Sequence, residues 1–188
     1  CQIVCVLDKM VPKVNTLCVV GPSTAGKTFV IEELFSRIMS PVCRTAFQGN
    51  YNFAFQDCVD KALIFIQETL IVPEAVDIIK PVLEGLETEV QVKCKSSQKL
   101  ARTPVFITSN NDPWSKCPKE KDALMNRMFY NKVRQIPEET WPQEGEHGYM
   151  KKPNVYAGAM LLSHVLGSME PQEIIDVAKG NVMAEVVH

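Results

Sequence analysis

The sequence predicts an α/β protein with a doubly wound, mainly parallel central sheet flanked by helices, and two observations support this. Three largely apolar runs, at residues 14–20, 62–66 and 104–108, suit strands that are covered on both faces. Helical patterns separate the strand-like runs, which is typical of βαβ units. In such a sheet, ligands bind at the carboxyl ends of the strands. The 188 residues are enough for one such domain with a small addition.

A glycine-rich turn follows the first predicted strand. Residues 21–28 read GPSTAGKT and match the phosphate-binding pattern G-x-x-x-x-G-K-[ST]. Gly21 and Gly26 allow backbone N–H groups to turn towards phosphate oxygens, and the positive end of the next helix adds its field. Lys27 is expected to reach the β and γ phosphates of a nucleotide, and Thr28 to bind Mg²⁺. The candidate nucleotide-binding residues are Gly21, Pro22, Ser23, Thr24, Ala25, Gly26, Lys27 and Thr28.

The remaining elements of the core follow in order along the chain. Residues 28–39 have the pattern of the crossover helix, and residues 43–47 that of a short second strand. Pro73 suits the first turn of a helix over residues 74–83. Residues 89–92 alternate in polarity and predict a half-exposed strand.

The C-terminal part is predicted to be a loop followed by two helices. Residues 138–153 are polar and rich in turn formers. A second, shorter helix is expected from Pro171 to Gly180, and His164, on the first helix, is expected to pack in the core. The first helix is predicted from the spacing of Val155, Ala159, Leu162 and Leu166.

Two polar residues follow buried strands and are expected at the same rim as the glycine-rich turn. Glu68 comes after the run 62–66, and Asn110 after the run 104–108. Glu68 could polarise a water molecule against the γ-phosphate near Mg²⁺, and Asn110 could orient that water or sense the phosphate. Either could instead be an ordinary residue at a strand end. No N-K-x-D element for guanine occurs, which weakens a GTPase interpretation.

A lysine-rich segment lies between two strand-like runs. Residues 93–99 read KCKSSQK, and Lys93, Lys95 and Lys99 suit contacts with phosphodiester oxygens that do not depend on base identity. Composition alone favours a solvated hairpin. The formal net charge of −2 and a pI near 6.0 imply that any nucleic-acid contact depends on such a local basic element.

Cysteine usage and hydropathy exclude several classes of protein. The seven cysteines include no C-x-x-C pair and there are three histidines, so no zinc site is expected, and we interpret the cysteines as reduced thiols of an intracellular protein. No apolar stretch approaches the ~20 residues of a membrane span, and no signal peptide is recognised. No membrane partner is therefore expected.

The order of these motifs resembles the superfamily 3 helicases of small DNA viruses, most closely the helicase domain of the large nonstructural replication protein of parvoviruses. The string KCKSS followed by TP-x-x-x-TSN is specific to this likeness. The matching segments are GPSTAGKT at 21–28, FQDCVDKALIFIQE at 55–68, VKCKSS at 92–97, TPVFITSN at 103–110 and LMNRMF at 124–129.

The resemblance implies an AAA+ type P-loop ATPase that uses ATP and Mg²⁺. It also implies a ring, expected to be a hexamer, that moves 3′ to 5′ along single-stranded DNA during viral DNA replication in the host nucleus. Lys93 and Lys95 match the lysines of the hairpin that grips DNA in the central pore, so the resemblance reverses the preference for a merely solvated loop.

The resemblance also implies catalytic roles. Lys27 corresponds to the phosphate contact, Glu68 to the catalytic acid and a Mg²⁺ contact together with Thr28, and Asn110 to the polar sensor. Arg127 stands in the arginine-finger position, where it would complete the site of the neighbouring subunit. The alternative for Arg127 is a surface arginine at the end of a helix.

The likeness covers residues 14–135, which we expect to form the ATPase core. Residues 1–13 are expected to be a lead-in from a missing N-terminal part, because the sequence does not begin with methionine. Residues 136–188 are expected to add a loop and a small C-terminal helical extension.

One departure from the family pattern leaves the function open. The family usually has two adjacent acids where this chain has Gln67 and Glu68, and a neutral amide is a poorer Mg²⁺ ligand than a carboxylate. The alternative to a motor is therefore a nucleotide-gated assembly module with weak ATPase activity, acting in packaging or transcription. A cellular AAA+ loader or a nucleotide kinase is a third interpretation.

Overall fold

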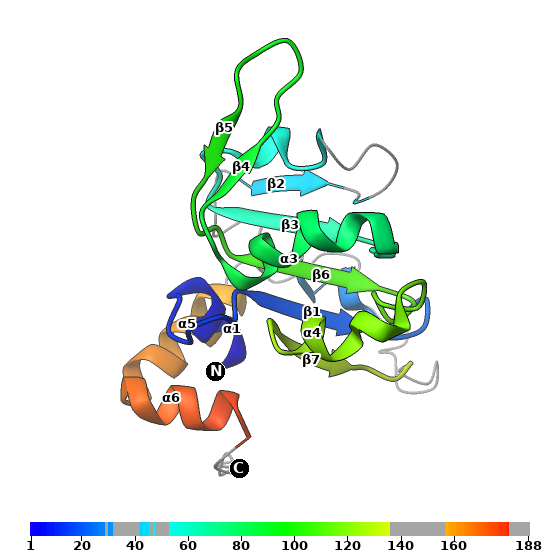
Figure 1. Ribbon diagram of the computed structural model, residues 1–188. Coiled ribbons are helices and arrows are strands. Elements are labelled where there is room, and N and C mark those ends of the chain that lie inside the picture. The colour runs from blue at the N-terminus through cyan, green and yellow to red at the C-terminus, as the bar shows by residue number, and fades with distance from the viewer. Residues whose placement is uncertain (29, 32–41, 46, 48–52, 136–156, 181–188) are drawn as a thin grey trace, which may run out of the picture.

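The computed structural model describes residues 1–28, 30–31, 42–45, 47, 53–135 and 157–180, and its centre is a five-stranded sheet. The strand order is β2-β3-β6-β1-β7, and every neighbouring pair is parallel (Figure 1). The prediction of a mainly parallel sheet is confirmed. The strands are β1 (Thr16–Val20), β2 (Val42–Thr45), β3 (Leu63–Gln67), β6 (Val105–Ser109) and β7 (Met128–Lys132).

The strand register brings the strand ends to one rim. Val20 at the end of β1 pairs with Ser109 at the end of β6 and with Lys132 at the end of β7. On the other side of β6, Gln67 pairs with Thr108. The residues that follow β1, β3 and β6 therefore emerge side by side.

Apolar clusters cover both faces of the sheet, as expected for continuous apolar strands. One face packs against α3 (Val76–Glu84) and α4 (Lys121–Met125), with Ile64, Ile66 and Ile107 from the strands. The other face, with Phe65 and Phe106, packs against α1 (Gln2–Leu7) and α6 (Pro171–Ala178). The three layers form the doubly wound arrangement that the sequence predicts.

The lysine-rich segment is a separate hairpin. Strands β4 (Thr88–Val90) and β5 (Gln98–Leu100) are antiparallel and form their own two-stranded sheet. The connecting loop projects from the body of the molecule, at the top of Figure 1. The predicted half-exposed strand at 89–92 overlaps β4, the first arm of this hairpin, which ends two residues earlier than predicted.

The two ends of the described chain lie together. The Gln2 side chain donates a hydrogen bond of 3.2 Å to the carbonyl oxygen of Ala178, and the Cys5 thiol lies 3.8 Å from the carbonyl oxygen of Ile174. The N-terminal helix and the C-terminal helices form one layer at the lower left of Figure 1. The lead-in and the extension therefore pack against each other, far apart as they are in sequence.

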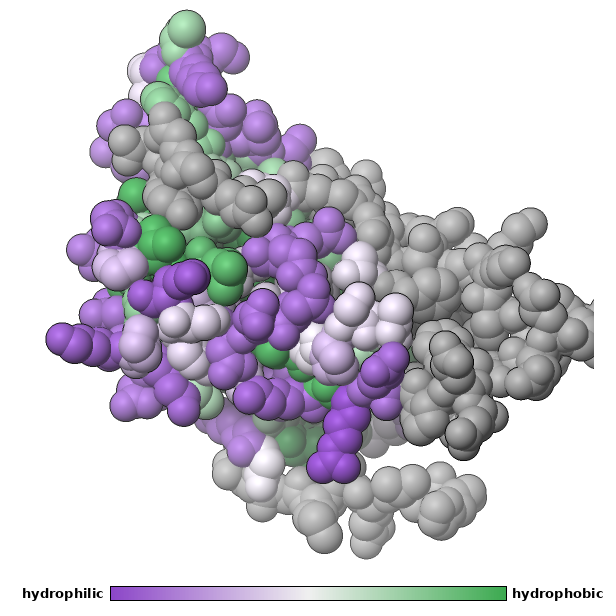
Figure 2. Space-filling model, turned by 90° about the vertical axis from the view of Figure 1, so that its right-hand side faces the viewer, coloured by the Kyte–Doolittle hydropathy of each residue, from purple (hydrophilic) through white to green (hydrophobic). Residues whose placement is uncertain are grey.

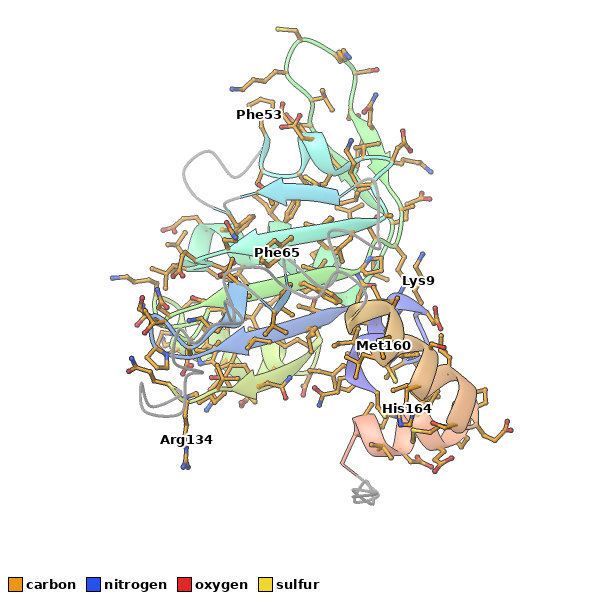
Figure 3. The ribbon with its side chains drawn as sticks, turned by 180° about the vertical axis from the view of Figure 1, so that it is seen from behind. Lys9, Phe53, Phe65, Arg134, Met160 and His164 are labelled. Carbon is orange, nitrogen blue, oxygen red and sulfur yellow. The ribbon has the colours of Figure 1, made fainter. Side chains whose placement is uncertain are left out.

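The two C-terminal helices are confirmed, but the prediction for His164 is wrong. In α5 (Ala157–Ser168), Val165 is the buried large apolar side chain among the described residues, whereas Ala159 and Leu166 are exposed. His164 is exposed as well (Figure 3). Successive residues are separated by about 100° around a helix, so His164 points away from the face that Val165 buries. The second helix ends before Gly180, whose φ of 75° is left-handed.

The predicted start at Pro73 is also confirmed. The residue opens a 3₁₀ turn, η3 (Pro73–Ala75), that leads into α3. Two further 3₁₀ turns are η2 (Gln56–Cys58) and η4 (Pro118–Glu120).

Several predictions concern residues beyond the described ranges. Lys27, Thr28, Val30 and Ile31 are helical, but most of the predicted crossover helix at 28–39 and the whole turn-rich segment 138–153 lie outside the described residues.

All seven cysteines are described, and all are free. The described helices are too short or too polar to traverse a lipid bilayer.

Candidate functional site

The glycine-rich turn is built as the sequence predicts. It leaves β1 after Val20, passes through left-handed backbone at Thr24 (φ 63°) and Gly26 (φ 75°), and enters a helix at Lys27. Gly21 is required for packing, because a Cβ atom there would lie 2.5 Å from the carbonyl oxygen of Val133. The turn is thus pressed against the end of β7.

Lys27 lies inside the turn, and its side chain is mostly buried. Its Nζ donates hydrogen bonds to the carbonyl oxygens of Gly21 at 2.9 Å and Pro22 at 2.7 Å. A third bond of 3.0 Å runs to Oδ1 of Asn110. The ammonium group is therefore held by oxygen acceptors, the type of partner that phosphate oxygens also provide.

Asn110 connects Lys27 to Glu68. Its Nδ2 donates to Oε1 of Glu68 at 3.0 Å, and its backbone N–H donates to Oε2 of the same carboxylate at 3.3 Å. Glu68 has a left-handed φ of 51°, and its N–H donates to the carbonyl oxygen of Thr108 at 2.8 Å. The ammonium, amide and carboxylate groups that were predicted from three separate motifs thus form one hydrogen-bonded chain, with the amide in the middle.

A polar cleft of about 250 Å³ opens over these groups. It lies on the rim that faces the viewer in Figure 2, where hydrophilic side chains cover much of the surface. The hydroxyl of Thr28 and the carboxylate of Glu68 are hard oxygen donors of the kind that Mg²⁺ prefers. No group of three or more His, Cys, Asp or Glu side chains within the described ranges could hold a metal alone. The cleft is lined by Ser23, Thr24, Gly26, Lys27, Thr28, Glu68 and Asn110.

A second, largely apolar cleft of about 620 Å³ lies on the other side of the same turn. It shares Gly26 and Lys27 with the polar cleft and reaches Leu17 and Val19 of β1. Gln2 of α1 is fixed at its wall, because Asn131 Nδ2 donates to Gln2 Oε1 at 2.8 Å. Sequence reasoning missed this cleft, since its walls come from both ends of the chain.

The hairpin carries the three predicted lysines in two different settings. Lys93 lies with its Nζ 5.6 Å from the centre of the Phe53 ring, and its N–H donates to Gln56 Oε1 at 3.4 Å. Figure 3 shows Phe53 beside the base of the projecting loop. Lys95 is exposed on the loop. Phe53 and Gln56 were not predicted, because nothing local in the sequence connects them to the hairpin.

Lys99 differs from the two loop lysines. Its Nζ forms an ion pair of 2.6 Å with Glu87, and both side chains are exposed. The hydrogen bond and the charge of Glu87 raise the pKa of Lys99. Lys99 therefore keeps its positive charge, but the carboxylate of Glu87 offsets that charge at the base of the hairpin.

Arg127 lies on the opposite rim from the glycine-rich turn. It precedes β7, and its carbonyl oxygen accepts a hydrogen bond of 3.3 Å from the N–H of Asn15, just before β1. A strand of five residues separates this rim from Gly21, which amounts to about 17 Å. Arg127 is therefore not part of the cleft in its own chain.

The guanidinium of Arg127 is held by two partners. Nε donates to Oε2 of Glu84 at 3.0 Å and Nη2 lies 2.9 Å from the same oxygen, while Nη1 donates to the carbonyl oxygen of Ala123. Glu84 is the last residue of α3. This ion pair was not predicted from the sequence.

Comparison with known proteins gives matches along most of the chain. A family model described as parvovirus non-structural protein NS1 matches residues 1–141. Protein Rep52 of adeno-associated virus 2 is 36% identical over 123 residues, which cover 62% of this chain and 30% of the relative. Initiator protein NS1 of porcine parvovirus (strain NADL-2) is 30% identical over 154 residues, covering 74% of this chain and 23% of the relative. The chain thus spans less than a third of these relatives.

Solved structures show the same fold. A structure of JCV helicase with a bound small molecule superposes with a TM-score of 0.64 at 12% identity, over 95% of this chain and 55% of that chain. The C-terminal region of NrS-1 gives a TM-score of 0.56 at 13% identity, over 87% and 39% of the two chains. The predicted AAA+ type α/β fold is confirmed.

Proposed function

The chain belongs to the parvovirus non-structural protein NS1 family, and we propose that it is the ATP-dependent DNA helicase domain of a viral replication initiator protein. The observation that carries this proposal is the hydrogen-bonded chain from Lys27 through Asn110 to Glu68 at the glycine-rich turn. It supplies a cation, a polar sensor and a carboxylate at one site, which is what hydrolysis of a γ-phosphate requires.

The two clefts on either side of the turn support one orientation of the bound nucleotide, with its phosphates in one cleft and its base in the other. Of these two clefts, the polar one is lined by Glu68 and Asn110 and the apolar one by neither, which favours the polar cleft for the γ-phosphate. The base and sugar then lie in the apolar cleft, beyond Gly26 and Lys27. Phosphate oxygens replace the carbonyl oxygens of Gly21 and Pro22 as acceptors for the Lys27 ammonium group.

We assign hydrolysis to the side chains of Lys27, Asn110 and Glu68. Glu68 accepts a hydrogen bond from the attacking water and polarises it, while the Asn110 amide orients that water and the phosphate. The Thr28 hydroxyl and the Glu68 carboxylate would hold Mg²⁺, which would supply charge neutralisation at the phosphate oxygens. Gln67 contributes no charge to that ion.

The position of Arg127 supports a ring in which each active site lies between two subunits. Because about 17 Å of strand separates Arg127 from its own turn, only another copy can bring it to a γ-phosphate. A head-to-tail contact repeated between copies forms a ring when the rotation from one copy to the next closes. We propose a hexamer in the host nucleus.

The hairpin is the proposed contact with single-stranded DNA. Lys93 and Lys95 provide charge for phosphates, and the Phe53 ring beneath Lys93 offers a face for base stacking. Lys99, paired with Glu87, contributes less. ATP binding and hydrolysis between subunits would move this hairpin and carry DNA through the ring in the 3′ to 5′ direction.

Strand displacement tests this function. Partial duplexes with a 3′ or a 5′ single-stranded tail are offered to the protein with ATP and Mg²⁺. The motor function predicts displacement that depends on ATP and on the 3′ tail. Binding of ATP without displacement would instead favour the alternative function, a nucleotide-gated assembly module, for which the neutral Gln67 side chain is the supporting observation.

A further inference from the structure

Glu84 orients the guanidinium group of Arg127. A guanidinium has five N–H donors. Nε and Nη2 of Arg127 meet one oxygen of Glu84, and Nη1 meets the carbonyl oxygen of Ala123, so three donors are engaged. The two donors that remain, one on each Nη nitrogen, are those that a phosphate would take. The pair is partly buried, with 24% of the Arg127 side chain and 14% of the Glu84 side chain exposed, which limits screening by solvent.

The hairpin follows shortly after Glu84. Gly85 caps α3 in the left-handed conformation (φ 80°), and β4 starts at Thr88, four residues after Glu84. The returning arm passes back under this turn, since a Cβ atom on Gly85 would lie 2.7 Å from Arg102 Nε. The start of the first arm and the end of the returning arm are therefore in close contact at this turn.

A buried asparagine joins these parts. The Asn15 Nδ2 donates to the carbonyl oxygens of Val82 at 3.1 Å and Thr103 at 2.6 Å, and its Oδ1 accepts a bond of 3.3 Å from Arg102 Nε. Its backbone N–H lies within bonding distance of the carbonyl oxygens of Leu83 and Arg127. The end of α3, the end of the hairpin and the backbone of Arg127 thus share one hydrogen-bonded centre.

We propose that Glu84 is a positioning residue that couples the hairpin to Arg127. DNA bound to the hairpin of one subunit then determines the position of that subunit's Arg127 guanidinium, which acts on the nucleotide of the next subunit. This inference rests on the proposed function. A displacement of the hairpin moves the last turn of α3, and the Glu84 carboxylate moves the guanidinium with it. The coupling passes through packed, hydrogen-bonded groups.

The test compares ATP turnover with and without single-stranded DNA in wild-type protein, E84A, E84Q, R127A and the double variant E84A/R127A. We expect E84A to reduce the stimulation by DNA about tenfold, within the usual range of coupling between two sites. Affinities for ATP and for DNA stay at wild-type values. E84A/R127A is expected to be no worse than R127A, because Glu84 acts through Arg127.

Two variants separate coupling from folding. E84Q keeps the shape of the side chain and a neutral acceptor, and is expected to lose an intermediate part of the stimulation. E120Q is the matched control, because it breaks the 2.6 Å ion pair between Glu120 and Lys80 of α3 without touching Arg127. Single-stranded DNA should stimulate the ATP turnover of E120Q as much as that of the wild type.

The outcomes also separate this inference from the proposed function. If R127A is inactive while folded E84A or E84Q is stimulated like the wild type, the coupling role is wrong. If E84A does not fold, the test depends on E84Q alone. Stimulation of its ATP turnover by DNA to the wild-type level would overturn the inference. If R127A hydrolyses ATP like the wild type, the arginine-finger assignment itself fails.

Discussion

Lys27 and Asn110, 83 residues apart in the sequence, are joined by a hydrogen bond of 3.0 Å between an ammonium group and an amide oxygen. The bond links the turn after β1 to the end of β6. Because Asn110 also donates twice to Glu68, one amide holds together the cation and the carboxylate of the proposed active site. Changes at these three residues should therefore have distinct effects.

Lys27→Ala is expected to abolish ATP binding at millimolar nucleotide and, with it, ATP turnover. Among the described residues, Lys27 is the charged side chain that lines both clefts, and its removal leaves phosphate oxygens without this charge-assisted donor. Calorimetry with ATP and Mg²⁺ measures the change. Lys119→Ala, an exposed lysine of η4, should bind like the wild type; equal binding by both variants would contradict the site.

Glu68→Gln is expected to keep nucleotide binding and to lower kcat by about 10²- to 10⁴-fold, the usual contribution of a general base. The amide preserves a hydrogen bond to Asn110 but polarises water poorly. Single-turnover hydrolysis and binding of a nonhydrolysable ATP analogue distinguish the two steps. A kcat within twofold of the wild type would assign the catalytic carboxylate to another residue.

Replacing Lys93 and Lys95 together by Ala should weaken binding of single-stranded DNA and flatten its salt dependence. Each lost phosphate contact reduces the slope of log K against log salt concentration by about 0.7 for single strands. Fluorescence anisotropy at several salt concentrations measures this slope. An unchanged slope would mean that the loop lysines do not contact phosphates.

Cys94 offers an independent probe of the same loop. Of the seven cysteines, it is the only one that is exposed, and it lies between the two loop lysines. Alkylation under native conditions should modify Cys94 first, and excess single-stranded DNA should slow its modification. Mass spectrometry of peptides identifies the site; modification at the same rate with DNA would place the DNA elsewhere.

Alkaline pH should destabilise the fold through Cys18. Burial first, and the charge of Asp112 second, raise the pKa of this thiol in β1 to about 12 from an ordinary value of 9.0. The unfolded chain therefore ionises Cys18 above pH 9 while the folded protein does not, so stability present below pH 9 is lost progressively towards pH 12. Between pH 8 and 10.5, the Tm of Cys18→Ala should fall less than that of the wild type. An equal fall would contradict a raised pKa.

The sequence was sufficient for features that depend on local pattern and parallel topology. The GPSTAGKT turn, the strands before Glu68 and Asn110, and the convergence of these residues all follow from strands whose carboxyl ends share a rim. Of the hairpin, the first arm was predicted from the alternating pattern at 89–92, whereas β5 (Gln98–Leu100) lies within the segment that was predicted to be a polar loop.

Features built from distant parts of the chain could not be predicted. The ion pair of Arg127 with Glu84 depends on how the end of α3 meets the residue before β7, and the apolar cleft depends on contact between Gln2 and Ala178. The error for His164 has another cause. The helix α5 is apolar on all sides, so its sequence does not indicate which side is buried.

ATP turnover in the presence of increasing single-stranded DNA tests the central claim most directly. A motor whose hairpin and active sites are coupled predicts low turnover without DNA and a saturable rise with it, lost in Lys27→Ala. Turnover that is absent, or that stays the same at every DNA concentration while ATP still binds, would contradict the motor and leave a nucleotide-gated assembly module.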